Sequence, residues 1–533
     1  MARTKPRRTL KQEAASSTHA VQWLELHPEL AVGVLIAMVT LAHLFYAVTY
    51  ALNPDEALQY HLAHRPSLGE AWRMNNTNAH PPFLSLALHF WRKIGTSELF
   101  LRLIPILSGA GFVWFSFGWA RLVLGLVPAL VFAAISALIP PVYAMSQELR
   151  QYMPMMLGIA AALYWFERAW VDRPLRNMAI SATGLLVAVL SNYSAAWFAA
   201  GFGCYGLWRL ARQPVASAAR LTWALGQIAA LATYAALYVT HLAKLRQSEL
   251  AAGVQEGFLR RLYRQPTDSI ADYLAFNMPG LVEYIFGSKL FAVLGVVLLL
   301  AGIVTLYQRR ARWPHHAVPV ALLLSVPALL WIGAALAGLY PLGGSRHCML
   351  FAMLFAVPVS LAVAELARGR ATIALSGTLA FMLMLQIVAI PEVRTQQLEA
   401  QRREHLREAV AYWKQQASRG LTFVDYQTSL LLCYYSNPQH MCTDQRNEHF
   451  LDYQMDGGRV AVSRNWSLHP TAFVEELREL KRIYQLPRGA EVWVIDGGWG
   501  EPLHRMLQVQ YSGSALPGLR AFGGSTGVFR VPN

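Results

Sequence analysis

The chain has 533 residues, of which 55% are hydrophobic and 14% are charged, and its mean hydropathy is +0.31. This composition is too apolar for a water-soluble protein of this length, so it excludes that class. A net charge of +15 is also found in nucleic-acid-binding proteins, but here Lys and Arg lie in short turns between apolar runs. That distribution is typical of polytopic membrane proteins, so we expect membrane lipids and no nucleic acid as partners.

The N-terminal 29 residues include several basic side chains between Arg3 and Lys11, and they predict a disordered cytoplasmic tail. No small-residue cleavage site follows the first apolar run, which should therefore remain as an anchor. Residues 30–390 predict a transmembrane domain, a polytopic helical bundle with about eleven crossings. The predicted crossings are 30–50, 103–119, 124–143, 153–169, 178–190, 196–210, 222–241, 290–307, 318–339, 349–366 and 373–390.

Basic turns predict the orientation of this bundle. The turns that contain Arg173, Arg212, Arg310 and Arg370 alternate with turns poor in Lys and Arg, so the positive-inside rule places them in the cytoplasm. Residues 83–94 would break the alternation if they crossed the membrane, and they are short. We interpret them as a helix in the outer interface. An odd number of crossings then exports everything after residue 390.

The exported region, 391–533, has a soluble composition and predicts a small α/β domain. Cys433 and Cys442 lie close together in it, and they can form a disulfide if the region is exported; the sequence leaves the paired and unpaired states open. The expected elements are helices over 392–416 and 471–484 and buried strands over 421–425, 459–463 and 491–495.

The first outer loop, 51–101, begins with two carboxylates, Asp55 and Glu56. An amphipathic stretch over 57–74 and the motif His80-Pro81-Pro82 follow. Ionisable groups near the membrane are costly unless they are paired or hydrated, so their position indicates function. The other candidate polar residues are also predicted on the outer face: His80, Arg102, Glu148, Arg150, Tyr152, Arg346 and His347.

These residue types suit the transfer of a sugar from a lipid phosphate. The reaction needs a carboxylate that takes the acceptor's proton, and Asp55, with Glu56 beside it, is placed for this role. It also needs positive charge for the departing phosphate, and the planar guanidinium of Arg102, Arg150 or Arg346 supplies it. No His/Cys cluster has zinc spacing and no phosphate-binding glycine loop appears, so we expect no cofactor. Metal dependence stays open, and the arginine-rich candidates favour a phosphate site without a metal.

Each residue also has a purely structural interpretation. Asp55 and Glu56 could be solvated loop acids, Arg150 could extend to the interface, and Arg346 could cap a turn. His80 precedes two prolines, which are well tolerated in the first turn of a helix. Glu148 and Arg150, two residues apart, do not face each other on a helix and need separate partners.

Taken together, the motifs resemble a known family. Asp55-Glu56, His80-Pro81-Pro82, Arg102-Leu103 and the segment from Ser146 to Tyr152 are similar in order to the C-type (GT-C) integral-membrane glycosyltransferases. The resemblance is to bacterial relatives of the protein O-mannosyltransferases and of the lipid A aminoarabinose transferase.

The resemblance implies a polyprenyl- or dolichyl-phosphate-sugar donor, inversion at the anomeric carbon, and Asp55 as the catalytic base. It also implies that 57–74 and 83–94 are juxtamembrane helices. The chain departs from the protein-modifying branch after its His-Pro-Pro motif, where Phe83-Leu84-Ser85 supplies no lysine.

Two classes of function follow. The first is a periplasmic-face glycosyltransferase in the bacterial inner membrane, acting on a glycan, lipid or protein acceptor. The second is a transporter or flippase for a lipid-linked or anionic solute. A transporter should show inverted repeats and ionisable groups near the bilayer midplane, whereas the candidates here gather on one face.

Overall fold

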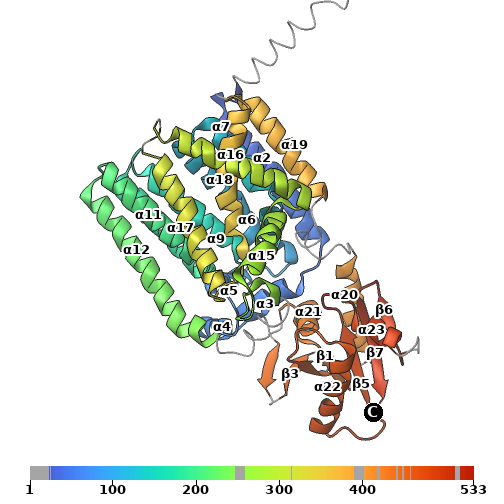
Figure 1. Cartoon of the computed structure of the whole chain (residues 1–533). Coiled ribbons are helices and arrows are strands. Elements are labelled where there is room, and N and C mark those ends of the chain that lie inside the picture. Colours follow the sequence, from blue (N-terminus) through green and yellow to red (C-terminus); the bar gives the residue numbers. More distant parts are fainter. Residues whose placement is uncertain are drawn as a thin grey trace, which may run out of the picture. The chain divides into compact units, whose positions relative to one another are not determined.

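The protein is described by a computed structural model with two compact units (Figure 1). The first unit comprises 1–44, 76–83 and 104–395, and the second comprises 45–75, 84–103 and 396–533. Residues 1–22 and 25 of the expected basic tail, the stretch 392–400 and the boundary at 390/391 fall outside the described residues. The structure describes 23–24, 26–245, 259–311, 313, 315–388, 401–416, 420–439, 442–446, 449–455, 458–510 and 516–532.

The predicted helical bundle is confirmed, since every one of the eleven predicted crossings contains a helix. Six described helices are long and apolar enough to cross a membrane: α2, α6, α10, the stretch Ser217–Leu245, α16 and α17. The relevant helices are α2 (Pro28–Thr49), α6 (Glu98–Val123), α7 (Leu126–Leu138), α8 (Pro140–Met145), α9 (Tyr152–Arg168), α10 (Pro174–Ser191), α11 (Ala195–Arg212), α12 (Ser217–Leu237) with η1 (Tyr238–Leu242) and α13 (Ala243–Leu245), α15 (Ile270–Phe286), α16 (Lys289–Arg309), α17 (Ala317–Leu336), α18 (Leu350–Leu366) and α19 (Ala371–Val388).

Small residues allow the bundle helices to approach closely. Gly158 in α9 lies against Gly184 in α10, and a Cβ added to Gly158 would stand 2.6 Å from the Gly184 carbonyl oxygen. In the same way, a Cβ on Gly302 of α16 would overlap the backbone of Pro358 in α18, and these two helices lie side by side (Figure 1). Close backbone contact increases van der Waals attraction, which is the main force between helices in a membrane.

One helix of this unit was not predicted. The sequence analysis predicts no helix between the crossings 222–241 and 290–307, but Ile270–Phe286 forms α15. Ser269 caps its first turn by accepting a hydrogen bond from the Asp272 amide. Asn277 is buried, and its side-chain amide donates to the carbonyl oxygens of Arg261 and Tyr273, which offsets the cost of burying it. Polar residues and an internal proline are therefore the reason that the sequence pattern did not indicate this helix.

The second unit contains the predicted α/β domain, built on a seven-stranded sheet in the order β2-β3-β4-β1-β5-β7-β6. β1 lies parallel to both β4 and β5, and the remaining pairs are antiparallel. The elements are α20 (Arg402–Gln416), β1 (Leu421–Val424), α21 (Tyr426–Ser436), β2 (Thr443–Arg446), β3 (Phe450–Met455), β4 (Gly458–Ser463), α22 (Pro470–Ile483), β5 (Glu491–Asp496), α23 (Leu503–Gln510), β6 (Arg520–Phe522) and β7 (Thr526–Pro532).

Alternating side chains bury both faces of this sheet. Val492 and Val494 of β5 face a core formed with α22 and α23, whereas Trp493 and Ile495 face a core formed with α20 and α21. The period of two along a strand explains the division. The Cys433 side chain of α21 is joined to Cys442 in a disulfide, which answers the question that the sequence left open.

The buried carboxyl group of Asp425, the N-cap of α21, should make the stability of this helix depend on pH. Its carboxylate accepts a hydrogen bond of 2.8 Å from the Thr428 amide, yet burial, with Asp496 nearby, raises its pKa to about 6. Because the pKa is raised in the folded state, the folded protein is favoured when Asp425 is protonated. This contribution to stability is fully present below the unfolded pKa of about 3.9, and it is lost as the pH rises through about 6.

Asp425→Asn should therefore stabilise α21 at pH 8, by up to about 3 kcal/mol, and have little effect at pH 3, because Asn keeps the cap without a charge. Amide-exchange protection factors for 421–436 in the intact protein would measure this. The same pH dependence in both proteins would contradict the prediction.

Candidate functional site

The two predicted acids lie in the first turn of α3 (Pro54–Ala63), where Asn53 is the N-cap. The Asn53 side chain accepts a hydrogen bond of 2.9 Å from the Glu56 amide, and the Glu56 carboxylate accepts one of 2.9 Å from the Asn53 amide. Pro54 takes the first helical position, where its missing N–H costs nothing. This capping box fixes where α3 begins, and with it the place of Asp55.

Arg102 anchors the same turn. Its five N–H groups donate five hydrogen bonds, two to the Glu56 carboxylate at 2.8 and 2.6 Å and three to the carbonyl oxygens of Ala47, Tyr50 and Ala51 at 3.4, 2.6 and 2.8 Å. The side chains of Arg102 and Glu56 are both 0% exposed. In this arrangement no N–H group of Arg102 remains for a phosphate, and the Glu56 carboxylate is held in an ion pair.

The other end of α3 is held by the juxtamembrane helices that the sequence predicted, α4 (Leu68–Asn75) and α5 (Phe83–Trp91). Nδ1 of His89 lies 3.1 Å from the Ala63 carbonyl oxygen, and Arg92 donates to the carbonyl oxygens of Ala63 and Arg65. Burial, reinforced by Arg65, lowers the pKa of His61 to about 3, so this ring is neutral.

C-terminal residues of this unit contact the chain on both sides of Asp55. The Tyr435 hydroxyl accepts a hydrogen bond of 2.9 Å from the Leu52 amide, and Arg403 donates to the Tyr50 carbonyl oxygen at 3.2 Å. Arg403 also forms an ion pair with Glu98 of α6. The α/β domain therefore supports the start of α3 directly.

A second group of predicted residues comes together in the first unit. The His80 ring lies 6.1 Å from Tyr152 and 6.4 Å from His347, between ring centroids, and Tyr152 lies 6.4 Å from His347. The Arg150 guanidinium lies 6.0 Å from the Tyr152 ring. Three separate segments thus supply this aromatic cluster, namely the turn before α5, the start of α9 and the 3-10 helix η3 (Arg346–Cys348).

The cluster is cationic. Burial lowers the pKa of His80 well below its usual value, and the charges of Arg150, His347 and Arg346 lower it further. His80 is therefore a neutral imidazole at neutral pH. Arg150 is 4% exposed, and Glu148, two residues before it, is equally buried, whereas Arg346 and His347 are half-buried.

Sequence reasoning did not identify His241 or Gln151, which lie near this cluster. The Tyr193 hydroxyl lies 2.6 Å from Nδ1 of His241, whose Nε2 lies 2.8 Å from the Asn78 carbonyl oxygen, so the loop 51–101 is tied to the end of η1. Gln151 is 1% exposed, and neither atom of its side-chain amide has a hydrogen-bond partner among the described residues. Buried amides are normally bonded, and a ligand or water would satisfy this one. Its position between the candidate residues Arg150 and Tyr152 was the sequence feature that could have identified Gln151.

The helical bundle, the juxtamembrane helices and the C-terminal α/β domain together form the GT-C fold of membrane glycosyltransferases, as the sequence motifs had suggested. The apo structure of ArnT, the aminoarabinose transferase from Cupriavidus metallidurans, is similar with a TM-score of 0.50 at 13% identity, covering 94% of this chain and 98% of ArnT. At this identity the similarity establishes the fold.

Further solved structures are more distant. ArnT bound to undecaprenyl phosphate gives a TM-score of 0.49 at 14% identity over 93% of this chain and 97% of ArnT. An oligosaccharyltransferase from Archaeoglobus fulgidus, tethered to an acceptor peptide, gives 0.43 at 13% identity over 78% of this chain and 63% of its own. No family model and no curated protein matches the sequence.

Proposed function

We propose that the protein is an inner-membrane glycosyltransferase that moves a sugar from a polyprenyl-phosphate donor to an acceptor on the periplasmic face, with inversion at the anomeric carbon. The observation that carries this proposal is the fixed start of α3. Arg102 and the capping box hold Glu56 completely buried, and the adjacent acid, Asp55, is thereby held at one defined position. Preorganisation of this kind is what a catalytic base requires.

In the proposed reaction, Asp55 takes the proton from the acceptor's hydroxyl or amine as that atom attacks the anomeric carbon. The bond between the anomeric carbon and the phosphate oxygen breaks, and the electron pair leaves with the polyprenyl phosphate. Attack opposite the leaving group inverts the configuration. The acceptor is a glycan, a lipid or a protein side chain. We assign Glu56 and Arg102 to positioning in place of the roles first expected for them, base and phosphate ligand.

We assign the departing phosphate to the cationic cluster. Arg150 and Arg346 supply positive charge, and stabilising a developing charge in the leaving group is a major source of catalysis. A neutral His80 can donate one hydrogen bond without competing for the acceptor's proton. Tyr152, His347, Glu148 and Gln151 complete this proposed binding surface. No metal or cofactor is required by this scheme.

The test is incubation of the purified protein with a panel of polyprenyl-phosphate sugars and candidate acceptors, scored by release of the lipid phosphate. Release that depends on both the sugar and an acceptor supports the proposal. A protein that moves intact lipid-linked sugars across vesicles without cleaving them would be a flippase, and that result would refute it.

We also propose that the α/β domain is periplasmic. A disulfide between Cys433 and Cys442 is stable in an oxidising compartment, which supports this orientation. In intact spheroplasts, a membrane-impermeant maleimide should label both residues only after reduction, and the Cys433→Ser/Cys442→Ser variant should lose that signal. Labelling that requires lysis of the membrane would reverse the assigned topology.

A further inference from the structure

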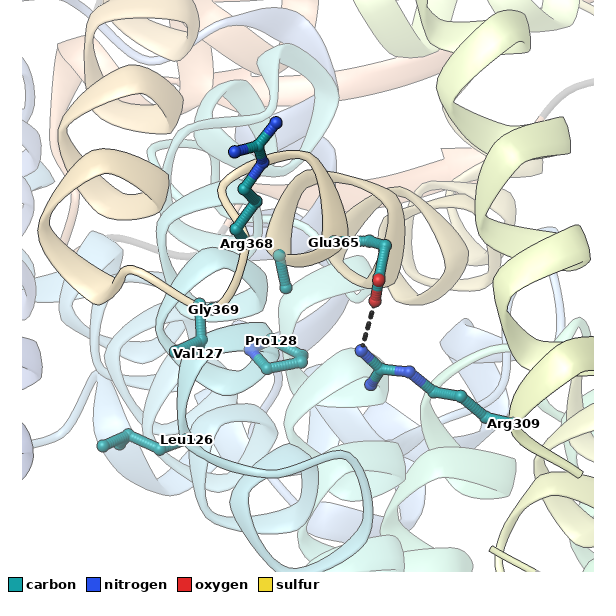
Figure 2. A pocket seen from close by; sticks show the side chains of 8 residues that line it. Leu126, Val127, Pro128, Arg309, Glu365, Arg368 and Gly369 are labelled. Atoms are coloured by element: carbon teal, nitrogen blue, oxygen red, sulfur yellow. Dashed lines mark hydrogen bonds and ion pairs between the residues drawn. The ribbon is translucent and has the colours of Figure 1, made fainter. Parts of the chain in front are cut away.

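A cavity of about 810 Å³ lies in the first unit at the end of the bundle opposite to the start of α9. It is formed where α16 and α18 end and α7 begins (Figure 2). Its size is in the range of small-molecule sites. The positive-inside rule assigns this end, with Arg309 and Arg368, to the cytoplasmic side. The proposed catalytic residues do not line it.

The cavity lining combines two arginines with one acid. Arg309 donates a hydrogen bond of 2.8 Å to Glu365, and these two side chains point toward each other in Figure 2. The Arg368 guanidinium is directed away from this pair, and no side-chain ion pair or hydrogen bond of Arg368 exists within the described ranges. Glu365 therefore neutralises the charge of Arg309, and the charge of Arg368 is not neutralised by an acid of the lining.

Apolar surface borders these charges. Leu126, Val127 and Pro128 form the first turn of α7, and Ala364 adds to the wall from α18. No side chain caps the start of α7, so its backbone amides add partial positive charge at the same place. A site with cations beside apolar surface, at the end of membrane-spanning helices, matches a ligand with an anionic head and hydrocarbon chains.

We propose that this cavity binds the phosphodiester headgroup of an anionic phospholipid. Arg368 and the amides at the start of α7 contact the phosphate oxygens, and Leu126 and Val127 contact the glycerol and upper acyl chain. Glu365 opposes binding, because it neutralises Arg309 and repels the phosphate. Inorganic phosphate has the same charged oxygens but gains nothing from the apolar wall.

The experiment measures lipid binding by the purified full-length protein in neutral detergent, by native mass spectrometry with phosphatidylglycerol and phosphatidylcholine. We expect preferential retention of phosphatidylglycerol. Arg368→Ala should weaken it about fivefold, from about 1 kcal/mol per interfacial arginine, and Glu365→Gln should strengthen it. Arg370→Ala removes one arginine from the same turn without touching the cavity and is the matched control.

Equal retention of both lipids, or the same loss in Arg368→Ala and Arg370→Ala, would overturn the proposal. A separate arm adds inorganic phosphate or the deacylated headgroup in place of the lipid. If either competes with phosphatidylglycerol at equal concentration, the cavity is a site for soluble anions and the lipid assignment is wrong. None of these measurements depends on glycosyltransferase activity.

Discussion

Asp55→Asn is expected to slow sugar transfer by about 10²- to 10⁴-fold, the usual contribution of a general base. Asparagine has nearly the same shape and suits the first turn of α3, so the fold should be retained. The loss should appear in kcat, because the carboxylate acts on the acceptor's proton and does not bind the donor. The measurement is release of lipid phosphate at saturating donor and acceptor, with melting temperature as the check on folding.

The matched control is Glu70→Gln, which removes an acid from α4 in the same outer loop. The Glu70 side chain is 42% exposed and pairs only loosely with Arg73, at 3.9 Å. This variant should keep wild-type turnover. If Asp55→Asn also turned over at the wild-type rate while folded, Asp55 would not be the base, and the proposed mechanism would have to be abandoned.

Arg102→Met is expected to destabilise the second unit by about 3–5 kcal/mol, because it leaves the fully buried Glu56 carboxylate without its counter-charge. Three backbone carbonyl oxygens lose their donor as well. The prediction is checked by denaturant unfolding in detergent. Arg73→Met, on the exposed surface of α4, is the matched control and should cost less than about 0.5 kcal/mol.

A double variant separates the ion pair from the lost backbone contacts. Glu56→Gln/Arg102→Met removes both charges and should be more stable than the sum of the single variants predicts, because no uncompensated charge stays buried. Strict additivity would mean that the two side chains are not coupled. Arg102→Met as stable as Arg73→Met would refute the anchoring role.

The sequence predicted the helices around the candidate site, but it did not predict the contacts that Glu56 and Arg102 make there. Apolar runs gave the helices, and carboxylates directly after the first of them indicated chemistry. Asp55 was expected to be the base, but nothing in the local pattern indicated that Glu56 is held by Arg102, which is distant in sequence and buried against it. This tertiary contact is the reason that we propose a positioning role for Arg102 in place of a phosphate ligand.

The missed elements have similar causes. α21 contains an unbroken apolar run, Leu430 to Tyr434, with no amphipathic period to indicate a helix. β2 and β6 form the two edges of the sheet and are only four and three residues long, so their pattern is too short to recognise. The predicted strands β1, β4 and β5 are the central parallel ones, where burial on both faces leaves a clear apolar signal.

The second unit is formed by segments that are synthesised at different times. Residues 45–75 and 84–103 are made early, whereas their partners in 396–533 are made last. The hydrogen bond from the Leu52 amide to Tyr435 cannot form until the ribosome has nearly finished. Contacts so distant in the chain fold slowly. Residues 45–75 and 84–103 therefore lack their C-terminal partners during most of translation. A chain truncated before α20 should be cleaved by proteases in these segments.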